Sequence, residues 1–199
     1  MSATIDKSYT AEDLLTMPDG DRYELVDGQL VERDMGSESG WIAARLLGLL
    51  FAHLNETQEG SIFTSDASYQ CFPGHPNRVR KPDVSFIRKG RLPNERPPRG
   101  HCSIAPDLVA EVVSPNDYYG EVIRKVFEYI EAGVALIWVV EPDSRSVMVY
   151  RADGRVSLHH EQDQLTGESV LNDFTCQISE LFPPKPNQNE SSAIAEQNG

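Results

Sequence analysis

Hydrophobic and polar residues alternate along the first part of the chain in patterns that predict a short helix, a hairpin and a long helix. The segment TAEDLL, starting at Thr10, resembles a capping box with Asp13 in the place usually taken by Glu, and it predicts a helix start. Alternating runs in YELVDGQLVE flank Asp27 and Gly28, a pair typical of a tight hairpin turn. Between residues 39 and 56 apolar side chains recur at helical spacing, which predicts the first core helix.

The middle of the chain predicts two strands and an irregular connection. Residues 62–72 and 83–87 have strand-like composition, and the turn-rich PGHPNR segment separates them. Residues 88–106 are rich in proline, which interrupts regular structure. We therefore expect this segment to be irregular.

A strand, a helix and a second strand are expected in that order after the irregular segment. Leu108–Val113 is a nearly continuous apolar run, as in a strand buried on both faces. Tyr118–Ala132 is amphipathic and is followed by Gly133, a residue typical of a helix end. Residues 134–140 are again apolar, so the two strands should be parallel with a right-handed crossover. Two more strands, expected to be antiparallel, follow at residues 146–151 and 155–160.

The length of 199 residues predicts one domain at residues 1–182, because domains commonly contain about 100 to 200 residues. The polar, proline-rich residues 183–199 are interpreted as a disordered tail. Cys71, Cys102 and Cys176 are too few and too scattered for a disulfide framework or a cysteine-rich zinc site, which favours a reducing compartment. The N-terminus contains no apolar signal segment, and no apolar run approaches the roughly 20 residues of a membrane span. We therefore expect a cytoplasmic protein without membrane contact.

The charge of the chain is unevenly distributed. With 31 acidic and 18 basic residues the net charge is -13, which disfavours binding to a polyanion through bulk charge. Residues 78–101, however, carry eight Lys or Arg residues against two acidic ones, a local charge of +6 around Asp83. Such a run is commonly a solvated loop. Its position beside a candidate carboxylate site also allows phosphate binding.

Glu111 and Asp83 are the candidate acidic residues of that site. Glu111 lies inside the apolar run LVAEVV, where an ionised carboxylate would be partly desolvated and would need a cation partner. The alternative is a strand end or sheet edge that lets the carboxylate reach water. Asp83 precedes a predicted strand, and an Asp in that position often bonds only nearby backbone amides.

Lys125 lies on the predicted amphipathic helix at the border of its apolar face. At about 100° per residue, it falls roughly 60° outside Val122, at the edge of the apolar arc. In one interpretation its ammonium reaches the carboxylates. In the other it extends into solvent beside Glu121, four residues earlier, in a surface ion pair that stabilises the helix by about 0.3 kcal/mol.

The ordered fragments YELVDGQL, RKPDVSF, PDLVAEVVSP and KVFEYIEAGVALIWVVEP together resemble the Uma-type restriction endonuclease family over residues 9–182. That family is part of the PD-(D/E)XK nuclease superfamily. The resemblance implies an α/β fold with a restriction-endonuclease-like core, in which helices flank a mixed β-sheet, preceded by an N-terminal β-hairpin. It also implies a metal-dependent endonuclease that acts on DNA, with DNA and a second copy of the chain as partners.

The resemblance further assigns roles to individual residues. Asp83 and Glu111 match the acidic residues of the motif and, with the backbone carbonyl of Val112, would bind Mg²⁺ or Mn²⁺ as oxygen ligands. The superfamily usually has a lysine two residues after the glutamate, where this chain has Val113, and Lys125 takes that role instead. Glu38 is a possible outer-shell carboxylate. The predicted DNA-binding residues are Arg78, Arg80, Lys81, Arg88, Lys89 and Arg91.

Other functions remain open at this point. One is a catalytically silent module that keeps the nuclease fold and binds DNA or a protein, although its intact Asp, Glu and Lys argue against it. Another is a metal-dependent hydrolase of small phosphoesters, which suits the acidic charge better. A phosphate loop, an HExxH zinc motif, a dinucleotide glycine motif and a nucleophile elbow are all missing from the sequence, so we expect no nucleotide cofactor.

Overall fold

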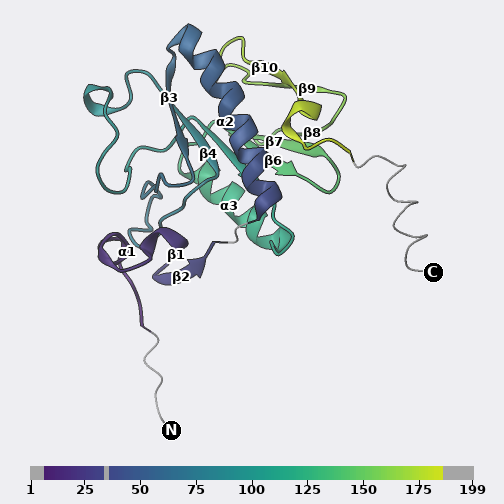
Figure 1. Cartoon of the computed structure of the whole chain (residues 1–199). Coiled ribbons are helices and arrows are strands. Elements are labelled where there is room, and N and C mark those ends of the chain that lie inside the picture. Colours follow the sequence, from purple (N-terminus) through teal and green to yellow (C-terminus); the bar gives the residue numbers. More distant parts are fainter. Residues whose placement is uncertain (1–6, 34–35, 186–199) are drawn as a thin grey trace, which may run out of the picture.

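The computed structural model describes residues 7–33 and 36–185 and contains a central six-stranded sheet between helices (Figure 1). The strand order is β3-β4-β5-β6-β7-β8, and only β5 and β6 are parallel neighbours. The predicted mixed α/β fold is therefore confirmed. The strands of this sheet are β3 (Gly60–Thr64), β4 (Val84–Arg88), β5 (Leu108–Val112), β6 (Leu136–Glu141), β7 (Ser146–Arg151) and β8 (Val156–His160).

The N-terminal elements form a small layer at one end of the molecule. Helix α1 (Ala11–Thr16) begins with both reciprocal bonds of the predicted capping box between Thr10 and Asp13. A 3-10 turn (Gly20–Arg22) leads into β1 (Tyr23–Val26), which pairs with β2 (Gln29–Glu32) in a hairpin. The two turn residues of the hairpin both have positive φ, 49° for Asp27 and 89° for Gly28, a conformation that glycine and aspartate tolerate well.

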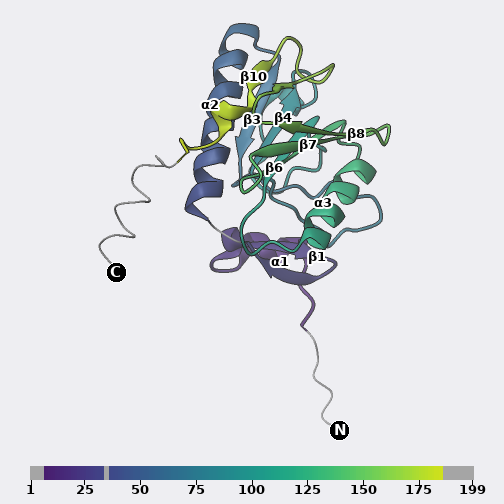
Figure 2. The same cartoon turned by 90° about the vertical axis from the view of Figure 1, so that its right-hand side faces the viewer.

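Two helices cover opposite faces of the sheet, α2 (Ser37–Thr57) and α3 (Tyr119–Glu131), as Figure 2 shows. The side chains of Ile42, Leu46 and Leu50 on α2 are fully buried, because the apolar positions recur at helical spacing and face the sheet. Helix α3 lies between the parallel strands β5 and β6 in the chain, as predicted, and ends before Gly133, whose φ is 92°. The long first helix and the crossover helix are thus confirmed.

The C-terminal part of the described chain adds elements that the sequence pattern did not reveal. Strands β9 (Gln164–Thr166) and β10 (Thr175–Gln177) form a separate two-stranded sheet, and a 3-10 turn (Ile178–Leu181) follows. Leu171 and Phe174, from the loop between these strands, join the same core cluster as α2. This segment therefore covers part of the α2 face. Its strands have three residues each, too few for a clear alternation.

One predicted strand is wrong in its extent. The expected strand at residues 62–72 becomes β3, which ends at Thr64. The backbone turns there, because the amide of Ala67 donates to the carbonyl of Thr64. Tyr69 then bridges to Arg80 and Cys102 outside the sheet. The predicted irregular connection follows β4. Within the described residues between β4 and β5, its one helical element is a 3-10 turn (Pro93–Glu95).

The remaining expectations concern the tail and the membrane. Residues 186–199, most of the tail predicted at 183–199, lie outside the described residues. None of the helices in the described ranges combines the length and the apolar composition that crossing a bilayer demands.

Candidate functional site: a carboxylate cavity with a helix lysine

Glu111 faces helix α3 from the centre of the sheet. Its neighbours on β5 divide between two cores: Ala110 and Val112 pack on the α2 side, and Val109 packs on the α3 side. Glu111 therefore points toward α3, and only 7% of the residue is exposed. The phenol of Tyr129 on α3 donates a 2.7 Å hydrogen bond to Oε1 of Glu111, which fixes the orientation of the carboxylate.

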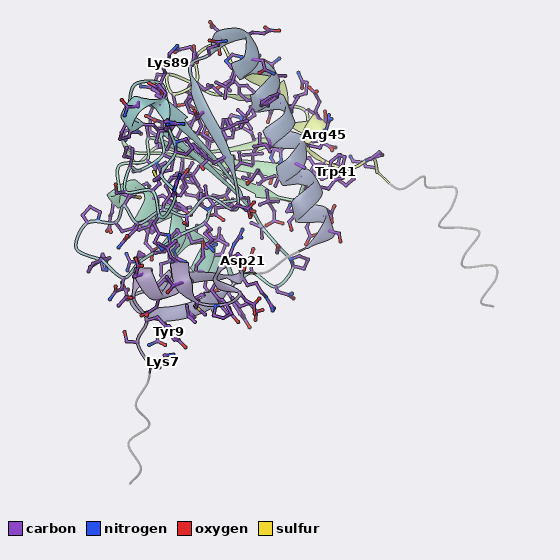
Figure 3. The ribbon with its side chains drawn as sticks, turned by 60° about the vertical axis from the view of Figure 1, so that its left-hand side comes forward. Lys7, Tyr9, Asp21, Trp41, Arg45 and Lys89 are labelled. Carbon is purple, nitrogen blue, oxygen red and sulfur yellow. The ribbon has the colours of Figure 1, made fainter. Side chains whose placement is uncertain are left out.

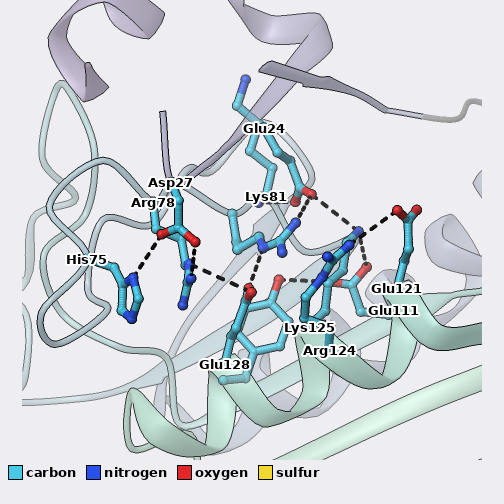
Figure 4. Close-up of polar contacts among 12 residues, drawn as sticks. Glu24, Asp27, His75, Arg78, Lys81, Glu111, Glu121, Arg124, Lys125 and Glu128 are labelled. Carbon is cyan, nitrogen blue, oxygen red and sulfur yellow. Dashed lines mark hydrogen bonds and ion pairs between the residues drawn. The ribbon is translucent and has the colours of Figure 1, made fainter. Parts of the chain in front are cut away.

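Lys125 extends from α3 toward the sheet (Figure 4). Its Nζ atom lies 3.5 Å from Oε2 of Glu111 and 3.4 Å from Oε2 of Glu24. Glu121, the partner in the solvent interpretation, instead pairs with Arg124 at 3.2 Å. The lysine thus lies beside the carboxylates, as the border position on the helix allowed.

Asp83 occupies the same region from the start of β4. Its Oδ2 accepts a 2.7 Å hydrogen bond from the backbone N–H of Val112, the residue after Glu111. The guanidinium of Arg33, just after β2, lies 3.9 Å from Oδ1. The antiparallel pairing of β4 and β5 therefore brings Asp83 and Glu111 to one edge of the site.

Glu24 is a site residue that the sequence analysis missed. It lies on β1, its side chain is 2% exposed, and it accepts hydrogen bonds from Arg80 Nη1 at 2.9 Å and from the amide of Lys81 at 2.8 Å. Alternation in a hairpin assigns a glutamate to the solvent face, so the pattern gave no reason to select it. The available signal was its position within YELVDGQL, one of the fragments that carried the family resemblance.

The two glutamates beside Lys125 have opposite electrostatic environments. Burial, helped by the charges of Asp83 and Glu24, raises the pKa of Glu111 to about 7, although Lys125 and the phenol of Tyr129 act in the opposite direction. Burial acts in the same direction on Glu24, but Lys125 and Arg80 together bring its pKa below the ordinary value. Burial also raises the pKa of Asp83. Burial therefore disfavours the ionised forms of Glu111 and Asp83, whereas Glu24 is stabilised as the anion.

Lys125 remains protonated in this environment. Burial by itself would lower the pKa of its ammonium, but the carboxylates of Glu111 and Glu24 raise it above the ordinary value. Burial and the charge of Glu111 likewise raise the pKa of Tyr129, which stays a hydrogen-bond donor. The site thus offers a cationic donor and a neutral donor on one helix.

These side chains line a cavity with a volume of about 90 Å³. That volume holds several water molecules, because one water needs about 10 to 15 Å³ on this measure. The hairpin, the start of β4, the end of β5 and the N-terminal half of α3 each contribute to the walls. The cavity is lined by charged residues that include Glu24, Glu32, Arg33, Arg80, Lys81, Asp83, Glu111, Asp117, Glu121, Arg124 and Lys125.

The donor set is suited to a hard divalent cation. Asp83 and Glu111 supply carboxylate oxygens, the ligands that Mg²⁺ prefers, and their buried negative charge would be relieved by a cation. Among the described residues, no group of three or more His, Cys, Asp or Glu side chains has an arrangement ready to bind a metal ion. The predicted set of two carboxylates and the carbonyl of Val112 needs no third side chain, so it stays a prediction.

Three of the six predicted DNA-binding residues lie inside the protein. Arg80 is 2% exposed and pairs with Glu128 at 2.7 Å and with Glu24. Arg78, which is also buried, pairs with Asp27 at 2.7 Å. The ammonium of Lys81 donates to the carbonyl of Gly20 at 2.8 Å. The burial of the three residues and their partners within the chain argue against phosphate contacts.

The other three predicted DNA-binding residues lie farther along the chain and are exposed. Arg91 pairs with Asp107 at 2.6 Å, and Nε of Arg88 donates to the carbonyl of Val170 at 3.1 Å. Lys89 lies at the end of the molecule opposite Tyr9 (Figure 3). The six basic residues therefore do not form one surface.

Glu38 lies in the first turn of α2 and is exposed. It is absent from the described lining of the cavity, whereas its neighbour Ser39 is part of that lining and accepts a 3.1 Å hydrogen bond from Ser114. An outer-shell role for Glu38 stays a prediction.

Comparison with known families identifies the chain. Residues 11–179 match the family described as "Uma2: Putative restriction endonuclease". The chain belongs to this Uma2 family. The resemblance inferred from its sequence fragments is thereby confirmed.

A solved structure supports the fold of this Uma2 family member. A crystal structure from Anabaena variabilis, described as "a putative nuclease belonging to DUF820", is similar with a TM-score of 0.72 and 20% sequence identity. The similarity covers 87% of this chain and 97% of that one. Comparison with curated protein sequences gave no match.

The raised pKa of Glu111 predicts how stability without metal depends on pH. Between the ordinary value of 4.5 and the folded value of about 7, the native state holds a proton on Glu111 that the unfolded state releases. The free energy of unfolding should therefore fall as pH rises through this range. Glu111→Gln should remove part of that fall, so the stability difference between the two chains should shift in favour of the variant as pH rises from 4.5 to 8. Denaturant unfolding in EDTA measures this, and a stability difference that does not change with pH would contradict it.

Proposed function

We propose that this chain is a divalent-metal-dependent nuclease that hydrolyses phosphodiester bonds in DNA. Membership of the Uma2 family supports a nuclease. The observation that carries the proposal is the contact of Lys125, on α3, with Glu111, on β5. Glu121, the nearer carboxylate in the sequence, pairs with Arg124 instead. Two neighbouring carboxylates can hold a cation, and a lysine donor beside them can stabilise phosphate charge, a combination that suits metal-assisted phosphodiester hydrolysis.

In this mechanism Asp83 and Glu111 would hold the cation, together with the carbonyl of Val112. A bound Mg²⁺ or Mn²⁺ supplies Lewis-acid chemistry, stabilising charge on phosphate oxygens and making water a stronger nucleophile near neutral pH. The amide of Val112 orients Asp83, and the phenol of Tyr129 orients Glu111.

Lys125 acts on the phosphate itself in this mechanism. An ammonium has three donors, and the described structure gives that of Lys125 two ionic partners, Glu24 and Glu111. The remaining donor can bind a nonbridging phosphate oxygen. Because charge grows on these oxygens in the transition state, a fixed cation there lowers the barrier.

A second candidate function is hydrolysis of small phosphodiesters. Arg78, Arg80 and Lys81 have internal partners, which leaves fewer cations for a DNA backbone. Glu32 and Glu121, which line the cavity with side chains 58% and 53% exposed, would repel flanking phosphates. These observations favour a substrate with one phosphate over a long polyanion. A silent module that keeps the fold is the third outcome.

Cleavage assays separate these functions. With millimolar Mn²⁺ or Mg²⁺, the chain should nick or linearise plasmid DNA, and EDTA or the double variant Asp83→Asn, Glu111→Gln should abolish cleavage. Mn²⁺ should also raise the melting temperature of the original chain more than that of the double variant, because a ligand that binds the native state stabilises it. Cleavage of a chromogenic phosphodiester without plasmid cleavage would favour the second candidate. Inactivity on both substrates, with no Mn²⁺ shift, would leave the silent module.

Lys125→Met tests the role of the lysine. Methionine keeps most of the apolar stem, so the fold and Mn²⁺ binding should persist, while kcat should fall on the order of a hundredfold, as when one preorganised donor is lost. Lys185→Met, an equal chemical change at a side chain that is 64% exposed and pairs with Glu161, is the control and should retain full activity. A folded Lys125→Met protein with the original cleavage rate would exclude the proposed mechanism.

The basic residues that remain outside provide a test of DNA contact. Neutralising Arg88, Lys89 and Arg91 should weaken DNA binding equally for all sequences and reduce the slope of log affinity against log salt by up to about one per lost phosphate contact. Titrations at several salt concentrations measure this slope. If the slope does not change, the side chains of these three residues contact solvent and not DNA. They would then differ from Arg78, Arg80 and Lys81 in lacking burial.

A further inference from the structure

The N-terminal hairpin forms one wall of the cavity although it pairs with no strand of the central sheet. Strands β1 and β2 form their own two-stranded sheet. The hairpin is attached through reciprocal backbone hydrogen bonds between Leu25 and Val79, 2.9 and 2.8 Å long. Leu25 is fully buried, so its neighbour Glu24 has a fixed position in the structure.

The carboxylate of Glu24 is held at both oxygens. Oε1 accepts from the backbone amide of Lys81 at 2.8 Å, and Oε2 accepts from Nη1 of Arg80 at 2.9 Å. The same Oε2 lies 3.4 Å from Nζ of Lys125 (Figure 4). Because the amide and the guanidinium fix the carboxylate, Glu24 presents a stationary negative charge to a lysine on another element.

The ammonium of Lys125 lies almost midway between two carboxylates. Its distances of 3.4 Å to Glu24 and 3.5 Å to Glu111 both exceed the roughly 2.7 to 2.9 Å of a close charge-assisted hydrogen bond. If Glu24 carried no charge, the attraction of Glu111 would lack its opposing partner, and Asp83 would be the other carboxylate acting on the ammonium. The ammonium would then be drawn toward Glu111 and compete with a cation for that carboxylate.

We propose that Glu24 is a positioning residue for the reaction: it holds Lys125 away from Glu111, so that Glu111 can bind the metal and Lys125 can bind the phosphate. This inference rests on the proposed nuclease function. Glu24 acts through Lys125 and need not touch substrate.

The alternative is that Glu24 merely neutralises Arg80. Glu128 provides a matched control, because it also pairs with Arg80, at 2.7 Å, and its side chain is 6% exposed. Its ionic partners in the described structure are Arg78 and Arg80. Glu128→Gln therefore removes a buried partner of Arg80 and leaves the two contacts of Lys125 in place.

Kinetics of Mn²⁺-dependent cleavage distinguish the two roles. Glu24→Gln should lower kcat about 10- to 100-fold, the usual effect of losing a residue that orients a site, with little change in KM. Glu128→Gln should change kcat by less than about threefold, as expected of a residue outside the reaction. In a Lys125→Met background, Glu24→Gln should cause little further loss, because residues that act as a unit are not additive. Equal losses in Glu24→Gln and Glu128→Gln would overturn the inference.

Stability without metal gives a readout that does not depend on activity. The losses of melting temperature caused by Glu24→Gln and Lys125→Met should be strongly non-additive, whereas Glu128→Gln and Lys125→Met should show a smaller coupling, because Glu128 and Lys125 share no ionic partner in the described structure. If Glu24 and Lys125 are uncoupled while the original chain cleaves DNA, the inference fails and the nuclease function stands. If they are coupled but the original chain cleaves no phosphodiester, the nuclease function fails, and the positioning role with it.

A second variant covers the case in which Glu24→Gln does not fold. Glu24→Asp keeps the charge but shortens the side chain, so its carboxylate cannot keep all three contacts. It should lower kcat more than Glu128→Asp does, and less than Lys125→Met. An aspartate variant as active as the original chain would also overturn the inference.

Discussion

Mutual neutralisation of buried charges is the constraint on which this structure depends. Glu24, Arg80, Glu111 and Glu128 are each at most 7% exposed, and burying an ion costs several kcal/mol unless a partner of opposite charge compensates it. The partners come from distant parts of the chain, since Arg80 joins the hairpin to α3 through Glu24 and Glu128. Removing one member of such a pair typically costs about 3 to 5 kcal/mol, so the site and the packing of the hairpin are energetically linked.

The crossover from β5 to β6 determines where the lysine can act. Parallel strands need a helix between them, and here that helix covers the face of β5 from which Glu111 extends. A lysine on this helix can therefore reach Glu111 although it is far from Glu111 in the sequence. Lys125 approaches Glu111 from above the sheet, which leaves the edge beside Asp83 open to the cavity.

The local excess of positive charge around Asp83 has two different uses in the fold. In its first half, Arg78 and Arg80 pair with carboxylates of the hairpin, and Lys81 donates to a backbone carbonyl. Its second half lies on the surface, where Arg91 meets Asp107. A count along the sequence cannot separate the two, because it does not reveal which acidic residues from other elements face the run. The net charge of -13 of the whole chain is the observation that favours the second candidate function over the proposed cleavage of DNA.

The sequence by itself determined the elements whose signals are local: the Thr10 capping box, the hairpin turn at Asp27 and Gly28, and the buried β5 with Glu111 inside it. Periodicity also placed Lys125 at the border of α3, and the family fragments selected Asp83. Only the tertiary structure decided the partners of Lys125, the burial of Arg80 between two glutamates and the presence of Glu24 in the site. The physical reason is that a hydrophobic pattern records which face of an element is buried, whereas an ion pair depends on which charges from distant elements meet on that face.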